Sequence, residues 1–410
     1  MSADYLVVLV TVADAAAGVA LGRALVEEEL AACAQVMPGG TAIFRWQGEI
    51  HADPQTQLLI KTRRGVWPAL QSRILALHDD EVPEILALPV ADGLPAYLGW
   101  LNEMTTGEMP DEEEALPSLP TAFWLDYADV YPRGRHAISG TLRILRGLYS
   151  PQLDNSRDIV VYLPPSYPTG GHHYPVLYMH DGQNLFDAAT SFAGEWYVDE
   201  TLEGLASQGI EAIVVGIPNI GSRRYHEYIP FPAPDLPDAQ GELYVNFIAD
   251  TVKPMIDRDF RTLPGRTTTG VMGSSLGGLI SLYAFFQRPD IFGMAGVVSP
   301  ALRWGKGGIF PFVTEAASAP GKIYMDVGTA EGTGLVSDPQ SQRSFAEHYV
   351  QQVRRMNALL KRKGYRTGET LLYVEEEGAI HHESAWARRM PAALRFLLGQ
   401  MPVAAERRRK

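Results

Sequence analysis

Apolar and polar positions follow one pattern through the first hundred residues of the chain. Apolar runs alternate with segments of helical spacing in the order strand, helix, strand, strand, helix, strand. That order is the split βαβ, ferredoxin-like arrangement of an α+β unit. The predicted strands are 5–11, 30–36, 41–46, 57–62 and 84–89, with a hairpin tip at 47–49, and the other segments are helices at 13–28 and 66–77 and a stretch at 95–101.

A second pattern begins near residue 139, where apolar strands alternate with longer amphipathic helices. This alternation predicts an α/β unit, a mostly parallel sheet with helices on both faces. Its active site belongs at the carboxyl ends of the strands. The predicted strands are 139–148, 158–163, 174–180, 213–217, 294–298, 322–327 and 370–374, and the clearest helices are 241–257 and 348–363.

Residues 105–120 join the two patterns and follow neither. They combine Pro110, Pro117 and Pro120 with the acidic run 111–114. Acidic segments that contain proline stay solvated and extended, so this stretch is a predicted linker. The chain is therefore expected to comprise a ferredoxin-like domain at 1–105, a linker at 106–120, an α/β domain at 121–400 and a basic tail at 401–410.

Composition narrows the possible environment and partners. The 410 residues carry a net charge of −13, which disfavours nucleic acid and anionic membranes as partners. A single cysteine, Cys33, excludes an intrachain disulfide and fits a reducing compartment. The N-terminus resembles no signal peptide, and no apolar run approaches the ~20 residues of a membrane span. A cytoplasmic location is expected.

The strongest chemical motif is Gly-x-Ser-x-Gly at 273–277, between an apolar strand and an apolar helix. A strand-to-helix turn this sharp strains its middle residue and requires small neighbours on both sides. Ser275 is that middle residue, whereas Ser274 lies one position off centre. We expect Ser275 to be an exposed nucleophile at the carboxyl edge of the sheet.

A nucleophilic serine needs an orienting acid and a base, which in this fold follow it along the chain. Asp326 and Glu331 lie in or after the strand at 322–327, and Glu331 is favoured because it follows Gly328 in the loop. The loop after the last strand contains His381 and His382, and spacing alone does not choose between them.

An oxyanion needs two backbone N–H donors. Leu276, directly after the nucleophile, is expected to supply one. The other is expected from Gln183, which follows Asp181 and Gly182 at the end of the strand 174–180. No cofactor is required.

The first domain contains four short motifs in order: Leu30–Cys33, Trp46–Ile50, Leu59–Thr62 and Glu81–Ile85. Together they resemble the CutA divalent-cation tolerance family over about residues 5–102. The resemblance implies a trimer, built through residues 1–105, and a link to divalent metals. His78 is followed by Asp79 and Asp80, where relatives carry Pro-Tyr. Cys33 and His78 are the candidate ligands but lack an obvious third partner, so the domain is interpreted as an oligomerisation module.

The second domain resembles, over about residues 125–400, the esterase family that groups esterase D-like, enterochelin-esterase-like and mycolyltransferase-like α/β-hydrolases. The resemblance implies that His381 is the base, Glu331 the acid and Gln183 an oxyanion donor. It also implies that Arg224 and Glu227 line or brace the site, although an i, i+3 ion pair explains them equally well. The motifs are Tyr178–Asn184, Gly273–Gly278, Val327–Glu331 and His381–Trp386; Asp181, Asn184 and His382 are further pocket candidates.

The sequence therefore predicts a serine carboxylic-ester hydrolase that acts on a small-molecule ester through an acyl-enzyme. Acyl transfer to an alcohol is an alternative that uses the same residues. A different alternative is a divalent-metal-binding protein whose hydrolase half is only a scaffold. Substitution of Ser275 by alanine separates these hypotheses, because it abolishes hydrolysis and leaves a metal response unchanged.

Overall fold

The computed structural model describes residues 5–46, 49–80, 83–90, 93–105, 124–131, 136–234, 236–333 and 337–399. The chain separates into two compact units, Met1–Thr121 and Ala122–Lys410. The predicted linker at 106–120, the basic tail at 401–410 and positions 47 and 48 of the hairpin tip lie outside the described residues. None of the helices within these ranges combines the length and apolarity needed to cross a bilayer.

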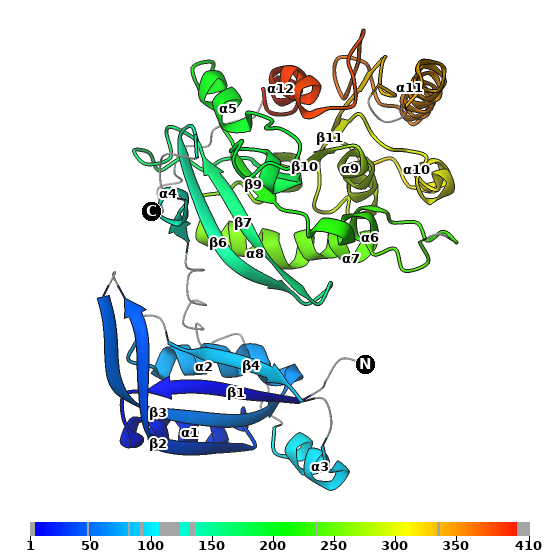
Figure 1. Ribbon diagram of the computed structural model, residues 1–410. Coiled ribbons are helices and arrows are strands. Elements are labelled where there is room, and N and C mark those ends of the chain that lie inside the picture. The colour runs from blue at the N-terminus through cyan, green and yellow to red at the C-terminus, as the bar shows by residue number, and fades with distance from the viewer. Residues whose placement is uncertain are drawn as a thin grey trace, which may run out of the picture. The chain divides into compact units, whose positions relative to one another are not determined.

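The N-terminal unit is an antiparallel sheet with strand order β2-β3-β1-β4 (Figure 1). Its buried strand residues pack with α1 and α2 in a single core cluster. Along β1, buried and half-buried residues alternate, as expected of a sheet covered on one face. The elements are β1 (Tyr5–Val12), α1 (Ala15–Glu27), β2 (Cys33–Trp46), β3 (Glu49–Arg63), α2 (Trp67–Leu77), β4 (Ile85–Pro89) and α3 (Pro95–Glu103).

One long strand, β2, replaces the two strands predicted at 30–36 and 41–46. Pro38, Gly39 and Gly40 look like a turn in the sequence, but the pairing of β2 with β3 only shifts register between Met37 and Gly40. Gly39 takes φ 98°, a conformation that costs glycine little, so the extra residues form a bulge and the strand continues.

The C-terminal unit is built on a sheet of nine strands among its described residues, in the order β13-β12-β11-β10-β8-β9-β7-β6-β5. Strands β8 to β13 pair in parallel, and β7, β6 and β5 extend the sheet antiparallel. The predicted mostly parallel sheet is thus confirmed. The strands are β5 (Leu125–Asp126), β6 (Thr141–Ser150), β7 (Asn155–Leu163), β8 (Val176–His180), β9 (Ile213–Ile217), β10 (Thr269–Ser274), β11 (Met294–Val298), β12 (Lys322–Gly328) and β13 (Leu371–Glu376).

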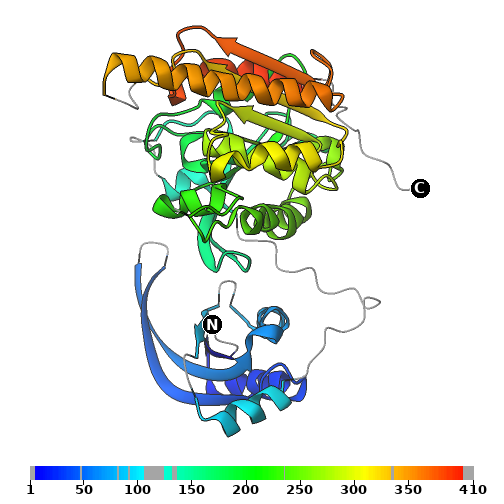
Figure 2. The same cartoon turned by 90° about the vertical axis from the view of Figure 1, so that its right-hand side faces the viewer.

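Helices cover both faces of this sheet (Figure 1), and the alternation within β10 shows why. Val271 packs in a core cluster with residues of α9 and α11, whereas the next residue, Met272, packs in a second cluster with α5 and α12. Figure 2 shows α11, in orange, crossing the unit close to β13. The helices are α4 (Tyr127–Val130), α5 (Val198–Ala206), α6 (Arg224–Tyr228), α7 (Gly241–Asn246), α8 (Lys253–Asp259), α9 (Leu276–Gln287), α10 (Ile309–Glu315), α11 (Pro339–Arg362) and α12 (Glu383–Leu398).

Candidate active site

Ser275 is the single residue between the end of β10 and the start of α9. Its backbone has φ 57° and ψ −117°, a strained combination for a residue with a side chain. The surrounding structure holds it there: its N–H donates to the carbonyl of Val298 (3.0 Å), and its own carbonyl accepts from the N–H of Ala301 (2.9 Å). The side chain is partly exposed, unlike those of its neighbours on both sides.

The glycines around Ser275 allow the helix to approach the strand. A Cβ on Gly273 would lie 2.8 Å from Cδ2 of His180 and 3.0 Å from the backbone of Gly277. His180 fills this space as a neutral ring, because complete burial lowers its pKa to about 3. Its Nδ1 lies 2.9 Å from the hydroxyl of Tyr244, which fixes the ring beneath the turn.

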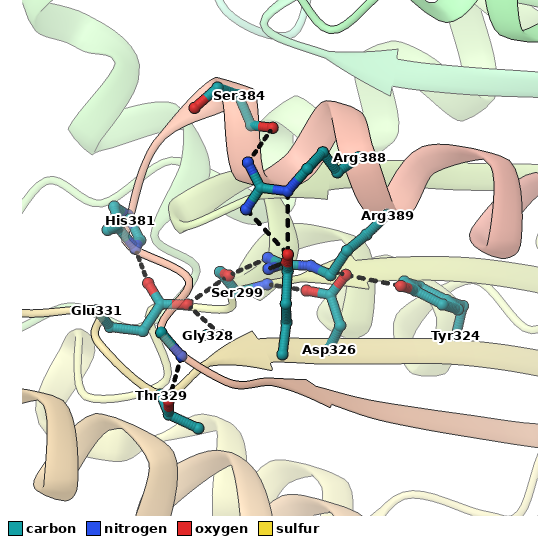
Figure 3. Close-up of polar contacts among 12 residues, drawn as sticks. Ser299, Tyr324, Asp326, Gly328, Thr329, Glu331, His381, Ser384, Arg388 and Arg389 are labelled. Carbon is teal, nitrogen blue, oxygen red and sulfur yellow. Dashed lines mark hydrogen bonds and ion pairs between the residues drawn. The ribbon is translucent and has the colours of Figure 1, made fainter.

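The structure brings His381 and Glu331 together. Nδ1 of His381 lies 2.5 Å from Oε2 of Glu331, and the carboxylate is fully buried while the imidazole is partly exposed. The second carboxylate oxygen accepts from the hydroxyl of Ser299 (2.6 Å) and from the N–H of Gly328 (2.7 Å). Figure 3 shows this carboxylate between His381 and Ser299. A carboxylate held in this way fixes both the orientation and the tautomer of the imidazole.

Two aromatic rings hold the other sides of His381. Tyr349 packs edge-on with a centroid separation of 5.6 Å, and Trp386 does so at 5.1 Å. Burial raises the pKa of Tyr349 well above its usual value, and its hydroxyl donates to the carbonyl of Ser299 (2.7 Å). Among the hydrogen bonds of the described residues, none joins the Ser275 hydroxyl directly to His381.

Asp326, the other candidate acid, has different partners. Its carboxylate accepts from the phenol of Tyr324 (2.8 Å), from Nε of Arg389 (2.8 Å) and from the N–H of Ser299 (2.9 Å). Arg389 also donates to the hydroxyl of Ser299, which in turn donates to Glu331. Asp326 therefore supports Glu331 indirectly, through Arg389 and Ser299 (Figure 3). The geometry therefore pairs the imidazole with Glu331.

Sequence reasoning missed Ser299, Tyr349 and Arg389. Ser299 had a usable signal, since a polar residue directly after β11 must lie at the carboxyl edge beside β10. The other two lie on α11 and α12 and reach the site only because those helices pack against neighbouring strands. No local pattern distinguishes them from ordinary helix residues.

The loop after β8 lies beside Ser275 in the strand order, because β8 and β10 are neighbours. Asp181 has φ 55° and is held by two hydrogen bonds from Arg224 (2.7 and 2.8 Å) and one from Asn219 (2.7 Å). Gln183 follows in a short 3₁₀ turn. The N–H groups of Gln183 and Leu276 both belong to the first turn of a helix, where intrahelical acceptors are missing.

The remaining pocket candidates have structural partners. Arg224 pairs with Asp181, and Glu227 is fully buried against Arg157 (2.8 Å), so the alternative of an i, i+3 pair between Arg224 and Glu227 is wrong. Asn184 is buried and accepts from the N–H of Phe192 (3.2 Å). His382 is exposed and caps α12, accepting from the N–H of Ser384.

The comparisons with known proteins give separate matches for the two units of the fold. Residues 150–397 match the family model described as "Putative esterase", which is more than half of the chain, and residues 6–104 match the model for the CutA1 divalent ion tolerance protein. The chain belongs to this esterase family and carries a CutA1 domain.

Individual relatives fall into the same two groups. The esterase domain is 26% identical to the uncharacterized protein YbbA of Bacillus subtilis (strain 168) over 262 residues, covering 62% of this chain and 98% of the relative. The CutA1 domain is 50% identical to the divalent-cation tolerance protein CutA of Thermus thermophilus, covering 24% of this chain and 96% of the relative. A solved structure of the latter is 48% identical and covers 25% of this chain and 98% of its own, with a TM-score of 0.24.

Within the CutA1 domain, the two candidate metal ligands engage other groups. Nε2 of His78 lies 2.6 Å from the carbonyl of Thr11, and its Nδ1 accepts from the N–H of Asp80. The thiol of Cys33 lies 3.9 Å from the amine of Lys61. Neither residue belongs to a group of three or more potential ligands among the described residues.

A cavity of about 430 Å³ adjoins the loop after β8 in the esterase domain. Gln183 and Asn219 form its boundary toward β8 and β9, and Tyr131, Ile144 and Phe186 supply apolar walls. A space of this size next to Gln183 is suited to a small apolar or aromatic group.

Proposed function

We propose that the protein is a serine carboxylic-ester hydrolase whose triad is Ser275, His381 and Glu331. The observation that carries the proposal is the 2.5 Å contact between His381 and a fully buried Glu331, at the sheet edge where Ser275 occupies a strained turn. Membership of the esterase family supports the same reaction class.

The proposed reaction begins when Nε2 of His381 takes the proton of the Ser275 hydroxyl. The serine oxygen attacks the ester carbonyl, the alcohol leaves with the proton from His381, and water then releases the acid from the acyl-enzyme by the same sequence. Glu331 holds the proton on Nδ1 and stabilises the imidazolium. The Ser275 hydroxyl must come within hydrogen-bond reach of Nε2, and such hydrogen bonds often tighten only when substrate binds.

The oxyanion of each tetrahedral intermediate would be held by the N–H groups of Leu276 and Gln183. Both groups stand at the start of a helical turn, where the backbone dipoles favour negative charge. The cavity beside Gln183 supports an ester with an apolar or aromatic group on one side of the scissile bond.

The CutA1 domain is proposed to assemble the enzyme as a homotrimer. Leu9 on β1 pairs in register with Leu59 on β3 and with Leu86 on β4. Two residues away on β1, Val7 pairs with Leu88, so these side chains share one face of the sheet. The helices α1 and α2 pack with the opposite face, and Leu86 and Leu88 are 51% and 49% exposed. An apolar sheet face of this kind is expected to be buried against further copies of the chain.

Covalent labelling tests the proposed chemistry directly. The full-length protein would be treated with a fluorophosphonate probe and assayed with short-chain p-nitrophenyl esters, and peptide mass spectrometry would locate the label. We expect the label on Ser275 and a burst of p-nitrophenol. The Ser275→Ala variant should lose hydrolysis by a factor of ~10⁴ or more, whereas Ser274→Ala should retain it.

Two results would contradict the proposal. In the first, the wild-type protein is labelled or hydrolyses the esters, but Ser275→Ala is as active as Ser274→Ala, because the nucleophile would then lie elsewhere. The other is a folded full-length protein with neither label nor turnover on any ester tested.

A further inference from the structure

The start of α5 and the segment before it carry a group of carboxylates that the proposed reaction does not use. Glu195, Asp199 and Glu200 each place one oxygen within 4.8 Å of those of the other two, and no second group of this kind occurs among the described residues. Glu195 is 7% exposed and Asp199 is completely buried, whereas Glu200 faces solvent. The group thus has two buried members and an open side.

The two buried carboxylates each keep an oxygen without a partner. Oε1 of Glu195 and Oδ1 of Asp199 are buried and accept no hydrogen bond. The other oxygen of Asp199 accepts from the N–H of Ser139 (2.7 Å), so the side chain is held firmly while its free oxygen remains available. Buried polar atoms are nearly always satisfied, so two unsatisfied oxygens in one place indicate a missing partner.

The charge of this group is also unbalanced. None of the ion pairs among the described residues includes Glu195, Asp199 or Glu200. A fourth carboxylate, Asp187, adds to the negative field at Glu195, although His136 lies 2.6 Å from it. Burial is the main cause that raises the pKa of Glu195 to about 7 and that of Asp199 to about 8. Neighbouring buried carboxylates without a counter-ion are costly, and either a bound proton or a bound cation relieves that cost.

We propose that Glu195, Asp199 and Glu200 bind a hard divalent cation of the calcium and magnesium class. All three side chains offer oxygen, which such ions prefer, and the group contains no thiolate or imidazole that would favour zinc or copper. Oxygens up to 4.8 Å apart can reach one ion from opposite sides at the ~2.4 Å distance typical of calcium, and the exposed side leaves room for water ligands.

The site would stabilise the wall behind the proposed base. Trp196, which follows Glu195, packs against Trp386 with ring centroids 5.6 Å apart, and Trp386 packs edge-on against His381. A cation that holds Glu195 and the first turn of α5 would therefore hold Trp196 in place. The indole next to the site also offers a means of detection.

Terbium luminescence and thermal unfolding test the proposal without use of the hydrolase reaction. The full-length protein would be stripped with EDTA and titrated at pH 8 with Tb³⁺, an oxygen-seeking ion whose emission is sensitised by a nearby tryptophan. We expect saturable emission that Ca²⁺ displaces, and a rise in melting temperature of several degrees in millimolar Ca²⁺ or Mg²⁺. Loss of one ligand in Glu195→Gln or Glu200→Gln should weaken binding about tenfold or more.

The control variant is Glu315→Gln, which changes an exposed carboxylate at the end of α10 and should bind as the wild type does. Both ligand variants should melt in EDTA at or above the wild-type temperature, because each removes one uncompensated charge. Glu200 is exposed, so Glu200→Gln remains informative if Glu195→Gln does not fold.

Absence of saturable emission and of any melting shift in the wild type would overturn the proposal and leave a shared proton as the explanation of the cluster. A metal response that is undiminished in both ligand variants would overturn it as well, because the ion would then bind elsewhere in the chain. Preference for Mg²⁺ over Ca²⁺ in the displacement assay would retain the site and identify the smaller ion as its occupant.

Discussion

The two sheets of this protein treat buried polar groups in opposite ways. In the CutA1 domain the buried polar side chains are Thr56, Thr62 and Thr105, and no carboxylate, lysine or arginine is buried among the described residues. In the esterase domain, buried charged groups such as Glu331, Asp326 and Arg389 are joined by hydrogen bonds at the carboxyl edge of the sheet.

The difference follows from the way each sheet is covered. In a sheet with one open face, charged side chains can remain in contact with water. Such a sheet offers its exposed face to a partner. A parallel sheet that is covered on both faces confines its polar groups to the loops at the strand ends, where low dielectric strengthens each interaction. The chemistry is therefore expected in the esterase domain and the assembly in the CutA1 domain.

The largest effect is expected from Glu331→Gln, which distinguishes the role of Glu331 from that of Asp326, the other candidate acid. The amide cannot hold His381 in the required tautomer, so kcat for p-nitrophenyl esters should fall by ~10³–10⁴. The matched variant Asp326→Asn should chiefly lower the melting temperature, because Arg389 then loses a buried partner. Equal losses of kcat in the two variants would contradict the assignment of distinct roles.

Acid should remove the part of the esterase domain's stability that depends on the neutral ring of His180. The pKa of His180 is lowered to about 3 when folded, against about 6.5 when unfolded, so the unfolded chain gains a proton as pH falls below 6.5 while the folded chain does not. The contribution of His180 is therefore present above pH 6.5 and should fall by about 2–3 kcal/mol by pH 4.5, whereas Glu195 and Asp199, whose pKa values are raised, contribute with the opposite sign.

Urea unfolding at pH 7 and pH 4.5 measures this loss. Between pH 7 and pH 4.5, the change in unfolding free energy of His180→Gln should be more favourable than that of the wild type by about 2–3 kcal/mol. His348→Gln, at an exposed position of α11, should show the wild-type dependence. Identical slopes in all three proteins would remove His180 from the explanation.

The open face of the CutA1 sheet should be essential for assembly. Leu86→Lys combined with Leu88→Lys adds charge to the apolar face, so the mass measured by light scattering should fall to that of a single chain. Val19→Lys, an exposed position of α1 on the other side of the sheet, should remain trimeric. A trimer that tolerates the double substitution would have to be built through another surface.

The smallest effect is expected from removal of the CutA1 domain. Residues 122–410 should retain the kcat/KM of the full chain, since every proposed catalytic group lies in the esterase domain and YbbA is matched over 98% of its length by that domain. A large loss of kcat/KM in a folded truncated protein would show that the CutA1 domain contributes to the site.

The sequence predicted most strands of both domains and their alternation with helices, because apolar periodicity reports which face of a segment is buried. It failed where local signals conflict with packing. Helix α12 was not predicted, since Pro391 in its interior resembles a stop signal, and α11 begins at Pro339, a full two turns before the amphipathic stretch recognised at 348.

The order of serine, acid and histidine along the chain made part of the candidate site predictable. Ser275, Glu331 and the pair His381 and His382 could be named because a strand-to-helix serine, a loop acid and a final-loop histidine follow one another in this fold. The choice of His381 over His382 came from the resemblance to the esterase family. Ser299 and Arg389 could not, because their contacts depend on which strands and helices become neighbours in space.

The backbone at Gly328, the last residue of β12, lies close to the backbone of Ala379. This contact has a consequence for any redesign of the esterase domain. A Cβ at this position would lie within the backbone of Ala379, and the N–H of Ala330 donates to the carbonyl of Ala379 (2.9 Å). The loops that carry Glu331 and His381 are thus fastened to each other and tolerate little insertion. New substrate preferences are better sought by substituting Tyr131, Ile144 and Phe186 in the walls of the cavity, which leaves the proton-handling pair and Gln183 unchanged.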